Sequence, residues 1–287
     1  MDEKNQFGGF WTQQKIDIFV KYLFAYLEIM KRQQFNLIYF DGFAGCGRID
    51  PEDNQLDDKS FIESVAMQVL SIDHPKSFDI YYMVDKHKKR SAQLSDLVKE
   101  NFPDLKAHVV RADCNDKLVS MTKFMKKNPN YRTLAFIDPF GMSLNWSSLE
   151  ACSSLGIDMW ILIPTGLGVN RLLKRNQEEI PESWFKKLEK FYGMSAQQIK
   201  DYFYKTQEHH SLFSNETFTT VQKTNNSVKK AVDLYKERLG NVWQYVSNPF
   251  PMRNSTGSVM YHFLMATNNP NGLKIANEII GKKLSNT

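Results

Sequence analysis

The sequence has few of the residues that would bind a metal through thiolates or place the chain in a membrane. Only three cysteines occur in 287 residues, Cys46, Cys114 and Cys152, and their spacing is not that of a zinc site. An odd number of cysteines also argues against a disulfide framework. No uninterrupted apolar run approaches the length of a transmembrane helix. The sequence therefore predicts a reduced, cytoplasmic protein with no metal site and no membrane segment.

Internal repeats, low-complexity segments and a strong charge imbalance are absent as well. The chain has 37 basic and 32 acidic residues, and its formal net charge is +5. This small positive excess permits an acidic partner without requiring one. The length is sufficient for one large domain, or for one domain with an inserted lobe, and for a substantial core.

The most informative segment is 36–48, with the sequence NLIYFDGFAGCGR. An apolar run typical of a buried strand ends at Asp41 and is followed by Gly42, Gly45 and Gly47. Glycine adopts backbone angles that other residues avoid and lets a ligand contact the main chain. The spacing differs from the G-x-G-x-x-G of dinucleotide-binding enzymes. The segment therefore predicts a strand followed by a turn that binds a ligand.

Apolar strand patterns alternate with helical patterns through the first half of the chain. Helical periodicity over 11–32 precedes the first strand. Within it, Lys15 and Tyr22 could point toward a bound ligand, but Lys15 is interpreted as solvated and Tyr22 as part of the core. Further strands are expected at 78–85, 107–114, 132–138 and 158–164. Strands this apolar indicate a mostly parallel sheet that is covered by helices on both faces.

Four of the expected strands end in an aspartate: Asp41, Asp85, Asp113 and Asp138. Ligand sites in parallel sheets lie at the carboxyl ends of the strands. We therefore expect these carboxylates to lie along one edge of the sheet and to form a site there. Aspartate is also a common turn residue, so a purely structural role stays open for each of them.

The alternation stops near residue 168, and the chain divides into three parts. Residues 1–167 are expected to form the core, and 241–287 to complete it with strands at 243–246 and 259–267 and a last helix at 272–283. Between them, 168–240 is expected to form an inserted helical lobe. Its expected elements are helices at 170–175, 181–192, 195–206 and 227–239, with a polar loop at 209–216.

The motif DGFAGCG at 41–47 resembles the first motif of class I S-adenosylmethionine-dependent methyltransferases. It is especially similar to the form found in enzymes that methylate amino groups of nucleic-acid bases. In order, DGFAGCG, LAFIDPFGM, DMWILIPTG and YHFLMATNNPNG resemble the three-Cys-motif partner (TcmP) family over nearly the whole chain. This resemblance implies a Rossmann-like class I methyltransferase sheet with a terminal antiparallel pair. It also implies a companion protein, which carries the cysteines of the family name.

The resemblance implies S-adenosylmethionine as cofactor and assigns roles to the strand ends. In such enzymes the glycine turn surrounds the methionine end of the cofactor. Asp85 would accept both ribose hydroxyls, and Asp113 would accept the adenine amine. An acid at the position of Asp85 also serves NAD in dehydrogenases, so this residue alone does not distinguish the two cofactors. The implied cofactor-binding residues are Asp41, Phe43, Gly45, Gly47, Asp85, Lys86, Asp113 and Cys114.

The resemblance also implies catalytic roles for Asp138, Pro139 and Phe140. Amino methyltransferases carry Asp/Asn-Pro-Pro-aromatic at this position. A carboxylate and a backbone carbonyl that accept the hydrogens of a base amine orient its nitrogen toward the methyl group, and an aromatic ring stacks on the base. Here Phe140 stands in the second proline position and Gly141 in the aromatic position. A different stacking geometry, another substrate, loss of catalysis and a plain turn therefore stay open.

Basic and aromatic residues occur together in the expected lobe, as in grooves that bind nucleic acids. The predicted DNA- or RNA-binding residues are Lys186, Lys187, Lys229 and Lys230. Amphipathic helices with solvated lysines give the same pattern. The sequence thus favours a methyltransferase acting on an exocyclic amine of a nucleic-acid base. A catalytically silent binding subunit for the companion protein and a small-molecule methyltransferase stay open as alternatives.

Overall fold

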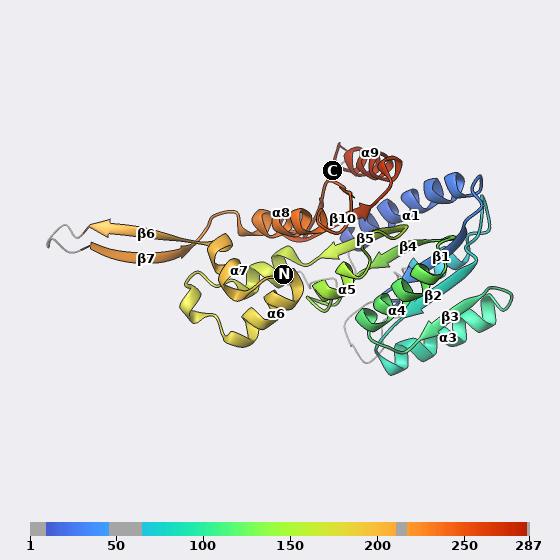
Figure 1. Cartoon of the computed structure of the whole chain (residues 1–287), viewed down its shortest axis with the longest axis horizontal. Coiled ribbons are helices and arrows are strands. Elements are labelled where there is room, and N and C mark those ends of the chain that lie inside the picture. The colour runs from blue at the N-terminus through green and yellow to red at the C-terminus, as the bar shows by residue number, and fades with distance from the viewer. Residues whose placement is uncertain (1–9, 46–64, 211–216, 286–287) are drawn as a thin grey trace, which may run out of the picture.

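A mixed β-sheet forms the centre of the computed structural model, which describes residues 10–45, 65–210 and 217–285 (Figure 1). The strand order is β3-β2-β1-β4-β5-β10-β8, and β9 pairs with β10. The parallel strands are β1 (Asn36–Asp41), β2 (Ile80–Val84), β3 (Ala107–Val110), β4 (Tyr131–Ile137) and β5 (Ile157–Ile163). The antiparallel strands are β8 (Tyr245–Val246), β9 (Phe250–Arg253) and β10 (Val259–Thr267).

Helices cover both faces of this sheet. The helices on one face are α1 (Phe10–Met30), α2 (Val65–Leu70), α3 (Lys88–Asn101) and α9 (Pro270–Ser285), and those on the other are α4 (Cys114–Lys127) and α5 (Trp146–Glu150). Along β4, Leu134 and Phe136 belong to the core on the side of α1, whereas Ala135 and Ile137 belong to the core on the side of α4. Successive side chains of a strand point to opposite faces, so both faces are apolar. The predicted α/β fold with a Rossmann-like, mostly parallel sheet is therefore confirmed.

The terminal antiparallel strands are also present. Residues Tyr245–Val246 pair with β10 as expected. No strand was predicted between 246 and 259, yet this segment contains β9, whose Phe250 and Met252 are buried. Their period-2 alternation is the signal of a half-buried strand, and Pro251 between them obscures it in the sequence.

The segment that follows β5 packs on the face of the sheet that α4 and α5 cover. It begins with a π-helical turn (Thr165–Asn170) and a 3₁₀ turn (Gln177–Glu179), and its longer helices are α6 (Glu182–Tyr192), α7 (Ala196–Phe203) and α8 (Ser227–Leu239). Phe185, Phe203 and Tyr235 share one apolar cluster with the strands. At the end of α6, Gly193 has φ +63°, and a Cβ there would lie 2.1 Å from Trp146 Cδ1. Only glycine fits this contact between α6 and α5.

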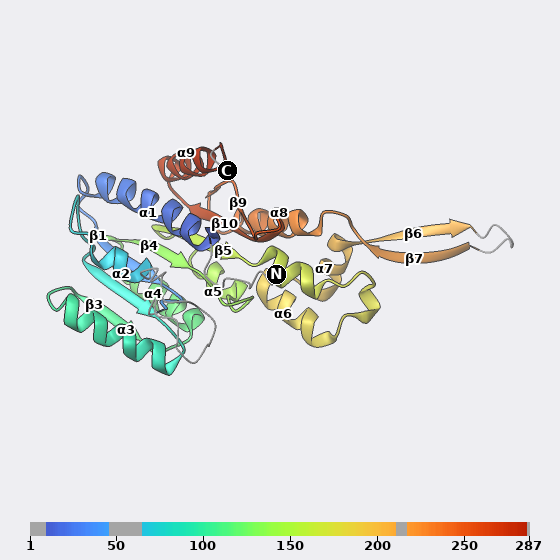
Figure 2. The same ribbon diagram turned by 180° about the vertical axis from the view of Figure 1, so that it is seen from behind.

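The prediction of a helical lobe is wrong for residues 204–210 and 217–223. A two-stranded antiparallel hairpin, β6 (Tyr204–His210) and β7 (Thr217–Lys223), extends away from the sheet (Figures 1 and 2). The predicted helix 195–206 ends at Phe203. Both strands contain tyrosine, threonine or valine, which favour strands. At the base of the hairpin, Lys223 Nζ donates to the carbonyl oxygens of Asn170 and Leu173.

Candidate functional site

The predicted aspartates lie at one edge of the sheet. Asp41 is the last residue of β1, and Asp85 and Asp138 directly follow β2 and β4. Asp113 comes three residues after β3 and is the N-cap of α4. Because β3, β2, β1 and β4 are neighbours and all parallel, their carboxyl ends share this edge. The expected convergence of the four residues is therefore present.

Asp41 is a buried carboxylic acid at the centre of this edge, with an exposed fraction of 2 %. Its Oδ2 accepts a hydrogen bond from the Tyr39 hydroxyl at 3.0 Å, and its Oδ1 accepts one from the Phe43 N–H at 3.1 Å. Burial raises the pKa of Asp41 to about 7; the nearby Asp138 carboxylate raises it further, whereas the two hydrogen bonds and Lys15 act in the opposite direction. Near neutral pH this carboxyl group therefore exists in both protonation states.

The turn after Asp41 packs tightly at one glycine and is open at the next. A Cβ on Gly42 would lie 2.5 Å from Cys114 Sγ and 2.8 Å from Ile137 Cδ1, so this position holds the turn against α4. At Gly45 no described atom lies within 4 Å of the corresponding Cβ position. Among the described residues, none blocks the approach of a ligand to the backbone of Gly45. The predicted site residue Gly47 lies outside the described residues.

Lys15 in α1 reaches this edge, and its interpretation as a solvated lysine is wrong. Its side chain is buried and forms an ion pair with Asp138 Oδ2, while 29 % of the Asp138 side chain stays exposed. Lys15 lies four residues before Phe19 and seven before Tyr22, both buried, so helical spacing places it on the inner face. That spacing is the signal that could have identified Lys15 as a site residue. A buried ammonium requires such a partner.

Asp85 is bound by Arg90, which the sequence analysis missed. The Asp85 side chain accepts hydrogen bonds from the His87 N–H at 2.7 Å, Arg90 Nε at 2.8 Å and Arg90 Nη2 at 3.2 Å. The His87 N–H and Arg90 Nη2 both bind Oδ1, and Arg90 Nε binds Oδ2. Both oxygens expected to face the ribose hydroxyls are therefore already hydrogen-bonded. The position of Arg90 in the first turn of the helix after Asp85 is the only sequence signal for this contact.

Asp113 has a structural role in addition to its expected one. Its Oδ1 accepts hydrogen bonds from the backbone N–H and the side-chain amide of Asn115, both at 2.9 Å, and its Oδ2 accepts one from Lys86 Nζ at 3.2 Å. Burial raises the pKa of Asp113, but these hydrogen bonds outweigh it and leave the pKa below its usual value. Burial raises the pKa of the Cys114 thiol, so Cys114 is a protonated packing residue at neutral pH.

The loop after β4 presents an aromatic ring to solvent. Pro139 is buried, whereas 65 % of Phe140 is exposed, and Gly141 has φ +61°. The Phe140 ring centroid lies 4.9 Å from the guanidinium carbon of Arg90. Phe140 is thus available for stacking at the edge that carries Asp138.

Two further polar residues lie beyond β4 at the same edge. Thr165 Oγ1 and His262 Nδ1 are 2.8 Å apart, and both side chains are buried. Burial lowers the pKa of His262 to about 4, so the imidazole is neutral at pH 7. This pair links β10 to the π-helical turn after β5. No sequence motif indicates this pair, because the partners are 97 residues apart.

The predicted nucleic-acid-binding lysines lie on α6 and α8, and the partners described for them do not include the strand-end aspartates. Lys186 and Lys229 each pair with an acid one helical turn away, Glu182 and Asp233 respectively. Lys230 donates to the Tyr202 carbonyl and lies over the Tyr202 ring. Lys187 is exposed. The structure therefore does not bring these four lysines into one cluster with the strand-end site.

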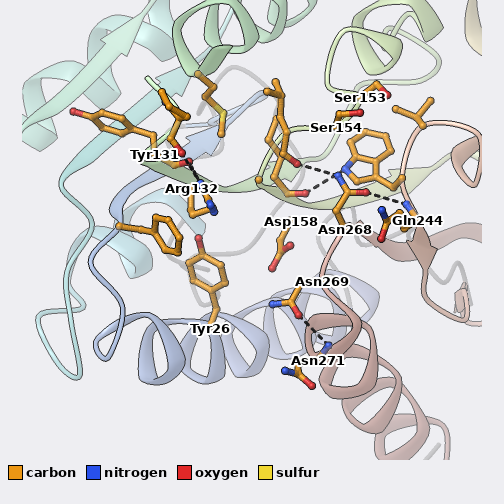
Figure 3. Close-up of a pocket in the computed structure, with 18 of the residues that line it drawn as sticks. Tyr26, Tyr131, Arg132, Ser153, Ser154, Asp158, Gln244, Asn268, Asn269 and Asn271 are labelled. Carbon is orange, nitrogen blue, oxygen red and sulfur yellow. Dashed lines mark hydrogen bonds between the residues drawn. The ribbon is translucent and has the colours of Figure 1, made fainter. Parts of the chain in front are cut away.

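A cavity lies at the opposite edge of the sheet (Figure 3). It has a volume of about 1160 Å³, and its lining includes Tyr26 of α1 together with Arg132 and Asp158, near the starts of β4 and β5. The Asp158 carboxylate is buried and accepts hydrogen bonds from the Tyr22 and Thr267 hydroxyls. None of the predicted site residues lines this cavity. It is therefore separate from the strand-end site.

Neither a metal cluster nor a membrane span is found in the described part of the chain. Residues 10–45, 65–210 and 217–285 contain no group of three His, Cys, Asp or Glu side chains placed to hold a metal ion. None of their helices combines the length and apolarity needed to cross a bilayer.

Comparison with solved structures gives distant similarities over most of the chain. Protein LPL1258 from Legionella pneumophila is 13 % identical, with a TM-score of 0.44 and coverage of 94 % of this chain and 92 % of that one. A putative S-adenosylmethionine-dependent methyltransferase from Listeria monocytogenes is 10 % identical, with a TM-score of 0.39 and coverage of 88 % and 98 %.

Trm1 from Pyrococcus horikoshii, solved with S-adenosyl-L-methionine, is 11 % identical, with a TM-score of 0.37 and coverage of 95 % and 71 %. No family model matches the chain, and no curated protein sequence matches it. These similarities concern the fold, and the assignment of the fold rests on the strand order described above.

The raised pKa of Asp41 predicts a pH-dependent stability. Between its unfolded pKa, near 4, and its folded pKa of about 7, the folded chain binds the extra proton. The contribution of Asp41 to the free energy of unfolding is therefore fully present below pH 4 and is lost as the pH rises through 7. Urea denaturation at successive pH values should show this loss in the wild type but not in Asp41→Asn.

Asp113→Asn is the control, because Asp113 should affect the free energy of unfolding in the opposite direction with pH. Its pKa is lowered in the folded chain, so its contribution is present above the unfolded pKa and is lost as the pH falls. Identical pH profiles for Asp41→Asn and the wild type would show that Asp41 titrates as an ordinary carboxyl group.

Proposed function

We propose that the chain is an S-adenosylmethionine-dependent methyltransferase that acts on an exocyclic amine of a nucleic-acid base. The observation that carries the proposal is the placement of Asp85, Asp41 and Asp138 at the ends of three adjacent strands, β2, β1 and β4. In this order, Asp85 is the proposed acceptor for the ribose hydroxyls on one side of the glycine turn, and Asp138 is the proposed acceptor for the amine on the other side. A methyl group that moves from a bound cofactor to the amine has to pass between these two residues.

The residues at the turn fit a nucleoside cofactor with an amino-acid end. The open backbone at Gly45 suits a close approach by the methionine portion. Asp85 supplies carboxylate oxygens for the ribose, and Asp113 lies one strand further, on the side proposed for adenine. When bound, the cofactor supplies a methyl group on a sulfonium, which a positioned nitrogen can attack without help from a metal.

Asp138 is proposed to orient the acceptor amine. The ion pair with Lys15 fixes the orientation of the Asp138 carboxylate. A carboxylate that accepts hydrogens from the amine increases electron density on its nitrogen and aims the lone pair at the methyl carbon. Asp138 or a water molecule would accept the proton that the amine loses when its nitrogen is methylated. Phe140 is proposed to stack on the base.

A second candidate is a methyltransferase-like binding subunit without turnover, which would serve the companion protein that the TcmP resemblance implies. The observation that favours it is the loop after Asp138, where Phe140 and Gly141 depart from the Asp/Asn-Pro-Pro-aromatic pattern. In this case the strand-end site would bind the cofactor, and the acceptor side would have no catalytic role.

Replacing the Asp138 carboxylate tests the enzymatic proposal. Asp138→Asn keeps the shape of the side chain and leaves Lys15 a hydrogen-bond acceptor, whereas alanine would remove this acceptor from a buried ammonium. We expect labelled-methyl transfer to DNA or RNA to fall by about 100-fold or more, with cofactor affinity nearly unchanged. Asp116→Asn, at an exposed acid on α4, is the matched control and should keep full activity.

Transfer that persists in Asp138→Asn would remove Asp138 from the chemistry. A wild type that binds the cofactor but transfers no methyl group, even with the companion protein present, would favour the binding-subunit candidate.

Nucleic-acid binding through α6 and α8 predicts a salt-dependent affinity. Lys187→Glu and Lys229→Glu reverse the charge of exposed side chains, whereas Lys230 is fixed by Tyr202 and its replacement would disturb packing. In fluorescence titrations of short DNA and RNA, each lost phosphate contact should lower the slope of log K against log salt by about one. Lys99→Glu, in the last turn of α3, is the control. A flat salt response, or curves equal to the control, would assign these lysines to solvated helix faces.

A further inference from the structure

The hydrogen bonds of Asp85 leave too few acceptor positions for a ribose diol. A carboxylate offers about four lone-pair positions, two on each oxygen. Oδ1 of Asp85 already accepts from the His87 N–H and from Arg90 Nη2, and Oδ2 accepts from Arg90 Nε. One position is left, on Oδ2, but two ribose hydroxyls require two. A diol can bind Asp85 through both hydroxyls only after Arg90 withdraws at least one of its hydrogen bonds.

Arg90 also lies across the glycine turn. It belongs to α3, which follows β2, and its guanidinium carbon lies 4.9 Å from the ring of Phe140, which follows β4. Strand β1 separates β2 from β4 in the sheet, so the two strand ends are about 10 Å apart. The contact between Arg90 and Phe140 therefore passes over the carboxyl end of β1, where the turn from Asp41 to Gly45 begins.

We propose that Arg90 and Phe140 form a latch over the cofactor site, and that Arg90 competes with the ribose diol of the cofactor for Asp85. This inference rests on the proposed function, because it concerns the same site. The side chain of Arg90 is 34 % exposed, so the guanidinium has room to move into solvent. Phe140, which is mostly exposed, holds the guanidinium in the closed position by a cation–π contact.

A latch of this kind lowers the apparent affinity of the site for its ligand. Only the open fraction of the protein binds a ribose diol through both hydroxyls, so the apparent dissociation constant of a diol ligand is the intrinsic one divided by that fraction. A partly exposed ion pair contributes up to about 1 kcal/mol, which corresponds to a roughly fivefold effect on affinity. Removal of the latch should therefore tighten binding by about fivefold, and the gain should depend on the presence of the diol.

Calorimetry with three probes tests the latch: S-adenosylhomocysteine, adenosine and 2′,3′-dideoxyadenosine. Arg90→Ala should bind the first two about fivefold more tightly than the wild type and should gain nothing for dideoxyadenosine. Phe140→Ala keeps the ion pair but removes the ring that holds Arg90, so it should give a smaller gain for the same probes. Lys88→Ala removes one positive charge from the start of the same helix and is the matched control.

The double variant Arg90→Ala/Phe140→Ala should bind no more tightly than Arg90→Ala alone, because the ring acts only through the guanidinium. Urea denaturation of each variant verifies folding, and Phe140→Ala provides the test if loss of Arg90 destabilises α3. S-adenosylhomocysteine is used because it has no net charge, unlike S-adenosylmethionine, whose positive charge would by itself raise its affinity for a site from which a cation has been removed.

The outcomes separate this inference from the proposed function. Weaker binding of S-adenosylhomocysteine by Arg90→Ala would make Arg90 a positioning residue for Asp85 and would overturn the latch, while the cofactor assignment would stand. An equal gain for dideoxyadenosine would overturn competition with the diol. Absence of binding of S-adenosylhomocysteine and adenosine in the wild type and all variants would overturn both proposals.

Discussion

The buried ion pair between Lys15 and Asp138 is the interaction on which the strand-end site depends. It fixes the beginning of α1 at the carboxyl end of β4, although the two residues are 123 positions apart in the sequence. Replacing Asp138 by alanine would remove this partner from a buried ammonium, which is strongly destabilising, whereas asparagine keeps a hydrogen-bond acceptor there. Burial is the main cause of the raised pKa of Asp41, about 7; the Asp138 carboxylate of the pair raises it further and Lys15 lowers it. The net charge beside the glycine turn therefore changes near physiological pH.

The sheet and its row of aspartates could be predicted because their signals are local. Each of β1 to β4 is a short apolar run with an aspartate as its last residue or within three residues after it. The spacing of Lys15 could place it on the buried face of its helix, but no local pattern identifies the distant acid with which Lys15 or Arg90 pairs. The hairpin strands at 204–210 and 217–223 were missed because most of their residues are polar, and they form a separate two-stranded sheet. Such strands lack the apolar alternation on which strand prediction relies.

Fold alone does not determine the activity, because Rossmann-like sheets serve many reactions. Asp85 at the end of β2 would suit NAD as well as S-adenosylmethionine. The glycine spacing after Asp41 and the paired Asp138 carboxylate favour methyl transfer over hydride transfer, since a hydride enzyme has no need of an amine acceptor at β4. The cavity at the opposite edge includes none of these residues, so it has no part in this proposal.

The choice of cofactor is the central claim, and parallel calorimetry of the wild type with S-adenosylmethionine, S-adenosylhomocysteine and NAD tests it most directly. The account predicts that the first two bind, that NAD does not, and that Asp85→Ala weakens binding of the first two by roughly 1–3 kcal/mol through loss of a hydrogen-bond acceptor. Binding of NAD in place of S-adenosylmethionine, or no binding of any of the three, would contradict it.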